Sequence, residues 1–243
     1  MVGASGTYPA PARPASGYVV EQAGTRVWCD AGPGTFTALP FDPDMIDAIV
    51  ISHQHPDHCS DLATAFHAWT YRPEPRHRVP LYAPQAVWDR LSLFLEKGPD
   101  SALYETFDFH PVVDQDAIEI GELSVTFVEV DHSVPTVGSR WEANNRTLFF
   151  TGDTGPGGCW RDSANQVSVM LSEASFQGSS EDKTVEHHLT AGEAGSIARE
   201  VGAHRLVLTH IPPYLDSARS IHEAELTFDR PVGLATPGTQ IDI

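Results

Sequence analysis

Four side chains that commonly bind metal ions lie within six consecutive residues of this chain. The segment reads His53-Gln54-His55-Pro56-Asp57-His58. It follows a strand-like apolar run over residues 47–52 and precedes a helix-like run over residues 61–71, and such turns carry the functional sites of layered α/β folds. Imidazole and carboxylate groups without thiolates are typical of an open catalytic site for Zn²⁺, Mn²⁺ or Fe. The segment therefore predicts a catalytic metal site in an α/β fold.

On both sides of this segment, short β-branched runs alternate with longer amphipathic runs. The expected strands span residues 17–21, 25–30, 47–52, 79–83, 123–131, 146–152, 167–173, 205–209 and 231–235. The expected helices span residues 61–71, 85–97, 191–201 and 217–228. Alternating strands and helices around a strand-rich centre favour a layered α/β architecture with helices outside paired sheets. The sequence shows no internal repeat, so we expect one domain over residues 1–243.

The composition limits the partners and the compartment. The formal net charge of −18 argues against a broadly basic surface that wraps a long nucleic acid, so such a partner would have to bind a local patch. Three cysteines are too few for a disulfide framework and no cationic-then-apolar leader opens the chain, so we expect a reducing, cytoplasmic setting. The longest apolar runs are strand-sized, which excludes a membrane-spanning protein and gives no reason to expect a membrane partner.

Three further ligand-type residues share one position in the expected pattern. His132, Asp153 and His210 each follow the carboxyl end of an expected strand. Strand ends at one edge of a layered sheet converge in space, so we expect these residues to join the six-residue segment. That segment alone cannot complete two coordination spheres, but with the three added residues two adjacent metal ions are the natural interpretation.

Together these residues resemble the shared pattern of the metallo-β-lactamase-fold hydrolases, which runs HxHxDH, a later His, a bridging Asp and a final His. The resemblance implies a single-domain, four-layer αββα sandwich over residues 1–243 with two divalent ions, Zn²⁺ in the first place and Mn²⁺ or Fe otherwise. It implies one ion held by His53, His55 and His132, a second held by Asp57, His58 and His210, Asp153 as the bridge, and Asp30 as a brace for the ligand loop. Oxygen-reducing di-iron members replace the second His with Glu, so His55 favours hydrolysis.

Two further segments resemble the ribonuclease Z branch of this family. Its SEA[ST] and H[LM][ST] motifs are matched by Ser172-Glu173-Ala174-Ser175 and His188-Leu189-Thr190. In that branch the Glu and the His form an acid pair beside the metals, which implies that Glu173 and His188 form such a pair here.

The chain departs from the tRNA-cutting members of that branch in one respect. Those enzymes carry a projecting arm, commonly between the third His and the bridging Asp, but here His132 and Asp153 are only 21 positions apart. This spacing leaves no room for the arm. Together with the net charge, it favours the compact relatives that hydrolyse small phosphodiesters, which include cyclic nucleotide phosphodiesterases of actinobacterial type.

We therefore expect a dinuclear metal-dependent phosphodiesterase whose substrate is a small phosphodiester, in the first place a 3′,5′-cyclic nucleotide. A metal-bridging hydroxide would attack phosphorus, and His188, oriented by Glu173, would donate a proton to the leaving alkoxide. His188, Glu173 and Asp57 form the expected catalytic set. The alternatives are a ribonuclease Z-type tRNA 3′ endonuclease, a lactonase or carboxylesterase on the same scaffold, and a non-catalytic sensor of metal or nucleotide. Relatives are commonly dimers, so the resemblance implies a homodimer.

Two neighbouring features have competing interpretations. The loop over residues 71–78 is the densest basic patch, which either contacts a phosphate or base or, as charge runs usually do, faces water. Phe66, Trp69 and Tyr71 lie at near-helical spacing, which predicts core packing, with base stacking by one of them as the alternative. Cys59 is expected to be a buried, inert thiol.

Overall fold

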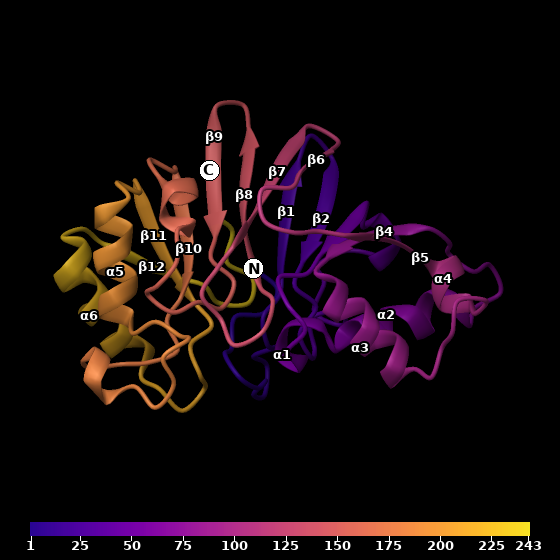
Figure 1. The fold of residues 1–243 in the computed structure, drawn as a ribbon, viewed down its shortest axis with the longest axis horizontal. Coiled ribbons are helices and arrows are strands. Elements are labelled where there is room, and N and C mark those ends of the chain that lie inside the picture. Colours follow the sequence, from indigo (N-terminus) through magenta and orange to yellow (C-terminus); the bar gives the residue numbers. More distant parts are fainter.

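Two β-sheets face each other in the computed structural model, which describes residues 1–243 except for the side chain of Asp182 (Figure 1). The first sheet contains, in spatial order, β1 (Tyr18–Gln22), β2 (Thr25–Cys29), β3 (Ala48–Val50), β4 (Val79–Ala83) and β5 (Phe107–Pro111). The second contains, in spatial order, β12 (Val232–Leu234), β11 (Arg205–Thr209), β10 (Val169–Glu173), β9 (Arg146–Phe150), β8 (Val137–Ala143), β7 (Leu123–Glu129) and β6 (Ala117–Ile120).

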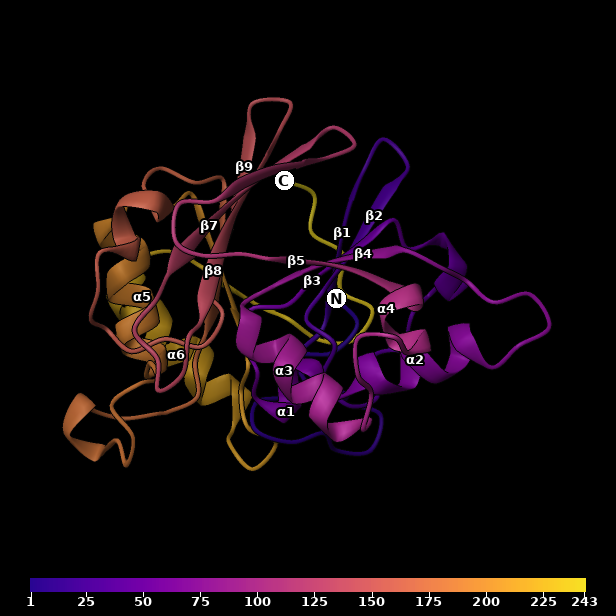
Figure 2. The same cartoon turned by 45° about the vertical axis from the view of Figure 1, so that its right-hand side comes forward.

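The helices divide between the outer faces of the two sheets (Figures 1 and 2). Beside the first sheet lie α1 (Pro56–Cys59), α2 (Asp61–Thr70), α3 (Gln85–Phe94) and α4 (Ala102–Thr106), and beside the second lie α5 (Ala191–Glu200) and α6 (Ser217–Phe228). Three short 3-10 helices complete the set, at Pro43–Met45, Trp160–Ala164 and Ser180–Asp182. The expected αββα sandwich is confirmed. Within the described part of the chain, each helix is too short or too polar to cross a bilayer.

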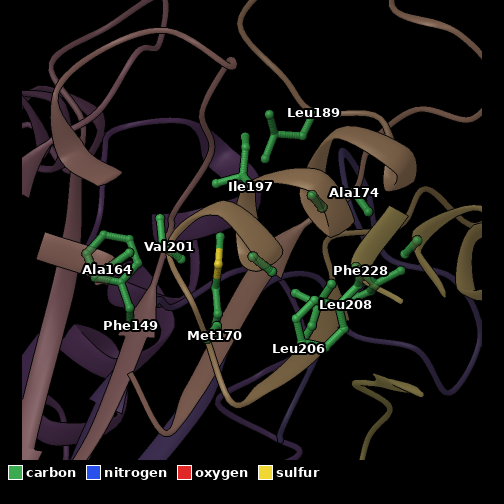
Figure 3. Packing of buried hydrophobic residues seen from close by; sticks show 14 of the residues in the cluster. Phe149, Ala164, Met170, Ala174, Leu189, Ile197, Val201, Leu206, Leu208 and Phe228 are labelled. Carbon is green, nitrogen blue, oxygen red and sulfur yellow. The ribbon is translucent and has the colours of Figure 1, made fainter. Parts of the chain in front are cut away.

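Three hydrophobic clusters lie between the four layers. In β10, Met170 packs in the outer cluster beneath α5 and α6 (Figure 3), whereas its neighbours Val169 and Leu171 pack in the cluster between the sheets. Successive side chains of a strand point to opposite faces, so a strand buried on both faces is a continuous apolar run. The third cluster, which includes Trp28 and Trp69, lies between the first sheet and α2. Packing on both faces makes the strands rigid supports for the loops that follow them.

The strand directions bring the ends of many strands to one edge. β10 is parallel to β9 and β11, and β7 runs the same way because it is joined to β9 through antiparallel β8. The loops that follow β7, β9 and β11 carry His132, Asp153 and His210. In the first sheet β2 and β3 are parallel, and the loops after them carry Asp30 and residues 53–58. Both sheets thus present ligand-type side chains at the carboxyl ends of their strands.

All of the strands and helices expected from the sequence pattern are present, with small shifts at their ends, but the pattern does not predict β5, β6, β8, α1 or α4. β8 contains Gly138, a residue that disfavours strands, yet this strand is hydrogen-bonded to β7 on one side and to β9 on the other. The helix expected over residues 85–97 ends at Phe94 instead, because the chain turns into left-handed backbone at Glu96, where φ is 53°.

Gly32 shows how closely the loop after β2 packs against α1. A Cβ atom on Gly32 would collide with the backbone oxygen of Asp57. Gly32→Ala should therefore lower the free energy of unfolding, measured in urea, by about 1–3 kcal/mol. Gly98→Ala is the control, because nothing lies within 4 Å of its Cβ position, and it should change the same quantity by about 0.5 kcal/mol or less. Equal effects of the two changes would contradict the close packing at Gly32.

Candidate functional site

The loops at the carboxyl edge of the sheets have backbone conformations that aim their side chains inward. α1 begins at Pro56, a first-turn position where the missing amide proton costs nothing, and it carries Asp57 and His58. Asp30 and His210 leave their strands with φ of 56° and 53°. Left-handed backbone is uncommon for residues other than glycine and costs free energy, so the surrounding packing must hold it. Backbone of this kind clusters at functional sites.

A first group of ligand atoms joins both sheets. His55 Nδ1 lies 3.0 Å from His53 Nε2 and 3.1 Å from His132 Nε2. Asp153 Oδ2 lies 3.6 Å from His53 Nε2. One ligand atom from each of these four residues lies within 4.8 Å of all the others, which is close enough for them to share one metal ion.

A second group lies beside the first. His210 Nε2 is 3.1 Å from His58 Nε2 and 3.2 Å from Asp57 Oδ2. Asp153 faces this group with its other oxygen, because Oδ1 is 3.3 Å from His58 Nε2 and 3.5 Å from His210 Nε2. The carboxylate of Asp153 thus lies between the two groups with one oxygen directed to each.

Hydrogen bonds accepted by the carboxylate of Asp30 orient two of these histidines, His58 directly and His53 through Ser52. Its Oδ2 accepts from His58 Nδ1 at 2.7 Å and from the hydroxyl of Ser52 at 3.0 Å. The Ser52 oxygen in turn lies 3.0 Å from His53 Nδ1. Because the Ser52 proton goes to the carboxylate, the network assigns the Nδ1–H tautomer to His53, and His58 Nδ1 likewise donates to Asp30. In the neutral rings, Nε2 of both histidines therefore presents a lone pair to the site.

The tautomer of His132 and the unsatisfied oxygen of Asp153 also fit a bound cation. His132 Nδ1 donates to the carbonyl of His187 at 3.0 Å, so its Nε2 also presents a lone pair. Asp153 is buried, and its Oδ1 accepts no hydrogen bond from any described residue. Converging lone pairs and an unsatisfied buried carboxylate oxygen are unfavourable unless a cation lies among them. The residues present therefore fit divalent metal ions.

The electrostatics of the site agree with this fit. Burial alone lowers the pKa of His58, but the carboxylates of Asp153, Asp57 and Asp30 outweigh burial and raise that pKa well above its ordinary value. Burial alone raises the pKa of Asp153, but the imidazoles of His210 and His58 hold it well below its ordinary value. The site therefore favours a positive charge at the place where the ligand atoms converge.

The side chain of Glu173 lies fully buried at the end of β10, and His188 lies against it. Glu173 accepts four hydrogen bonds, from His188 Nδ1 at 2.8 Å, from the amide of Thr154, and from the amide and hydroxyl of Ser175. These bonds fill the acceptor capacity of a carboxylate, so Glu173 cannot turn. Burial alone lowers the pKa of His188, but the charge of Glu173 and the bond to it raise the pKa to about 9. The pair holds a proton beside the ligand groups.

The structure brings together all the residues expected in the site. The seven expected ligands fall into the two groups, and Glu173 and His188 form the expected contact. A third combination, Asp153, His188 and His210, is also close enough to share an ion, so His188 has a second interpretation, as a metal ligand. Sequence reasoning missed the roles of Ser52 and Ser175; the only signal was their position, next to His53 and inside the motif that contains Glu173.

The three arginines of the basic loop over residues 71–78 bind other groups of the protein. Arg72 pairs with Asp44 at 2.8 Å, and Arg78 pairs with Asp108 at 2.7 Å. Arg76 donates to two backbone carbonyl groups. The three cations are thus engaged in the protein's own structure, and no bond of theirs is directed to the ligand groups.

Of the aromatic residues near the six-residue segment, two belong to the core. Phe66 and Trp69 are buried in the cluster beneath α2, as core packing predicts, whereas Tyr71 is 64% exposed. Cys59 is also buried, and burial raises the pKa of its thiol to about 12, which agrees with an inert thiol.

The αββα sandwich with two His/Asp groups at one edge is the arrangement of a metal-dependent hydrolase. The family model described as the Beta-lactamase superfamily domain matches residues 25–211. The chain belongs to that superfamily, and the family implies divalent metal ions at this edge.

Known proteins agree with this assignment. The chain is 33% identical to the uncharacterized protein Rv1339 of Mycobacterium tuberculosis over 238 residues, which are 96% of this chain and 87% of that protein. It is 29% identical to the ribonuclease Z of Methanopyrus kandleri over 270 residues, with 94% of this chain and 91% of that protein covered. The crystal structure of the metallo-beta-lactamase fold protein YhfI from Bacillus subtilis matches with a TM-score of 0.85 and 25% identity, covering 98% of this chain and 96% of that one. The expected resemblance to the ribonuclease Z branch is confirmed.

Proposed function

We propose that the enzyme hydrolyses a small phosphodiester, in the first place a 3′,5′-cyclic nucleotide, with two divalent ions, Zn²⁺ before Mn²⁺ or Fe, and with His188 as the general acid. The observation that carries this proposal is the position of His188 against both ligand groups. Its ring is parallel to that of His210 in the second group, at a centroid distance of 5.8 Å, and forms a T-shaped pair with the ring of His132 in the first group, at a centroid distance of 5.1 Å. A proton held there reaches a substrate bound across both groups.

The residues would divide the chemistry as follows. Divalent ions bound by the two groups would lower the pKa of water toward neutrality and offset charge on the phosphoryl oxygens. His188 keeps its Nδ1–H on Glu173, so Nε2 is the ring nitrogen that would donate a proton to the substrate. Asp57 Oδ2 accepts a hydrogen bond from the amide of Thr7 at 2.9 Å, which fixes this carboxylate in the second group. We assign Asp57 to the catalytic set.

The presence of a proton donor favours a phosphodiester over a lactone or a carboxylester as the substrate. A ribose alkoxide is a poor leaving group at neutral pH, so a positioned proton donor contributes roughly 10²–10⁴-fold to its departure. Hydrolysis of a lactone or carboxylester on this scaffold needs the ions but not a separate acid. The geometry of the His188–Glu173 pair also argues against a sensor without turnover, because binding alone gives no use for a proton donor.

A side-by-side measurement of hydrolysis rates tests this proposal. With Mn²⁺ or Zn²⁺ present, the purified protein should hydrolyse 3′,5′-cyclic AMP and bis-p-nitrophenyl phosphate and leave a homoserine lactone unchanged. Turnover of the lactone without turnover of either phosphodiester would replace the proposal with a lactonase. Absence of turnover on every substrate, in protein shown to hold metal, would favour a sensor.

We expect weak or no cleavage of tRNA precursors. The net charge is −18 and the cations of the basic loop are engaged within the protein, so few contacts remain for a phosphate backbone. Each missing contact lowers affinity and flattens the dependence of binding on salt. Cleavage assays and binding measurements over a range of salt concentrations check this expectation. Efficient processing at physiological salt would favour a ribonuclease Z-type endonuclease instead.

A further inference from the structure

The hydroxyl of Ser175 lies between the acid pair and the second ligand group. Ser175 is buried, and its Oγ is 2.7 Å from Glu173 Oε2, 2.9 Å from His210 Nδ1 and 3.3 Å from His188 Nδ1. It is therefore the one atom among these contacts that touches the carboxylate of the pair and a ring of the second group at the same time.

The position of the single hydroxyl proton follows from these distances. A hydroxyl donates one hydrogen bond and accepts others through its two lone pairs. The carboxylate of Glu173 is the closest acceptor and carries charge, so the Ser175 proton goes to Oε2. Ser175 Oγ must then accept from His210, which places the ring proton of neutral His210 on Nδ1. His210 Nε2 is left with a lone pair.

On its other side, His210 faces carboxylates. Its Nε2 lies 3.2 Å from Asp57 Oδ2 and 3.5 Å from Asp153 Oδ1. If Nδ1 had no acceptor, these oxygens would draw the ring proton to Nε2, where a metal ion would have to displace it. The Ser175 hydroxyl opposes this by making the Nδ1–H tautomer the more stable one.

The same arrangement occurs once more in the site. Ser52 donates to Asp30 Oδ2 at 3.0 Å, and its oxygen lies 3.0 Å from His53 Nδ1 in the first group. A buried carboxylate, a serine hydroxyl and a histidine thus form a chain behind each ligand group. One hydrogen-bond partner would satisfy each buried hydroxyl, yet each of the two serines contacts both a carboxylate and a histidine. The second contact is therefore extra in both chains, which points to a shared role.

We propose that Ser175 is a positioning residue that holds His210 in its metal-binding tautomer and ties the second ligand group to the carboxylate of the acid pair. This rests on the proposed metal site, because it concerns the affinity of that site. Glu173 then serves two histidines, His188 directly and His210 through Ser175. Groups that orient metal-ligating histidines in this way typically account for about 10–100-fold of metal affinity.

Competition between the protein and a chromophoric chelator for Zn²⁺ tests the role of Ser175. Ser175→Ala should weaken the binding of one of the two ions by about 10–100-fold. Ser175→Thr keeps the hydroxyl and should recover most of the affinity. Ser139→Ala is the matched control, because Ser139 is a buried serine of β8 whose hydroxyl accepts a hydrogen bond from Trp141 and contacts no ligand histidine in that bond. This variant should bind Zn²⁺ like the wild type. Thermal unfolding of each metal-free variant checks that it folds.

A second readout follows the tautomer itself. In the ¹⁵N spectrum of the metal-free wild type, His210 should show a protonated Nδ1, and in Ser175→Ala the proton should move toward Nε2. Unchanged Zn²⁺ affinity in folded Ser175→Ala, or equal losses in the Ala and Thr variants, would overturn the role of Ser175. A wild-type protein that binds no Zn²⁺ would overturn the proposed metal site itself, so the two failures can be told apart.

Discussion

Replacing His188 with alanine should slow the hydrolysis of a 3′,5′-cyclic nucleotide by roughly 10²–10⁴-fold, the scale of general-acid catalysis. The same change should have a small effect on bis-p-nitrophenyl phosphate, because p-nitrophenolate leaves without a proton. The loss should therefore grow with the pKa of the leaving group. Steady-state rates on the two substrates, measured for wild type and variant, give the comparison.

Metal analysis of the same His188 variant separates its two interpretations. As a proton donor His188 is no ligand, so His188→Ala should keep both ions. A variant that loses an ion would instead make His188 a ligand with Asp153 and His210, the third combination that the distances permit. Equal losses on both substrates at full metal content would leave His188 with a positioning role and would reopen the lactonase alternative.

Asp153→Ala should lower the metal content from two ions per chain and abolish most of the activity on both substrates. Asp153 directs one oxygen to each ligand group, 3.6 Å from His53 Nε2 and 3.3 Å from His58 Nε2. Without this anion, nothing between the groups offsets the repulsion of two adjacent cations, which is strong at short distance in a buried site. Elemental analysis after dialysis measures the loss.

Asp131 provides a matched control for Asp153. Its carboxylate lies in the same region, 3.3 Å from His187 Nδ1, but it belongs to neither ligand group. Asp131→Ala should keep both ions. Full metal content in Asp153→Ala would show that Asp153 does not bridge, whereas equal losses in both variants would mean that any nearby negative charge is sufficient.

Much of the site could be inferred from local sequence because its ligands have local signatures. The spacing of His53, His55, Asp57 and His58 places several donors on one turn, and that pattern needs no knowledge of distant contacts. His132, Asp153 and His210 could be inferred because each follows a strand, and apolar strands are recognised from short runs of residues. The pairing of Glu173 with His188 depended on a resemblance, since no local pattern joins them.

The elements that the sequence pattern did not predict are stabilised by neighbours rather than by their own residues. β8 is a strand because β7 and β9 hydrogen-bond it from both sides. α1 is a single turn between His55 and Ser60, too short to show the periodicity of a helix. The helix beginning at Gln85 ends early because the chain turns at Glu96.

The sequence by itself determined the order of most strands and helices, the side chains available as ligands and their position after strands, since these depend on residue type and short-range spacing. Only the tertiary structure decided which ring nitrogens face the site. That choice depends on hydrogen bonds between residues far apart in the chain, such as His58 with Asp30 and His210 with Ser175. Each bond joins the segments that follow two neighbouring parallel strands, β2 and β3 in the first case and β10 and β11 in the second, so it forms only once those strands pair and bring one segment within reach of the other.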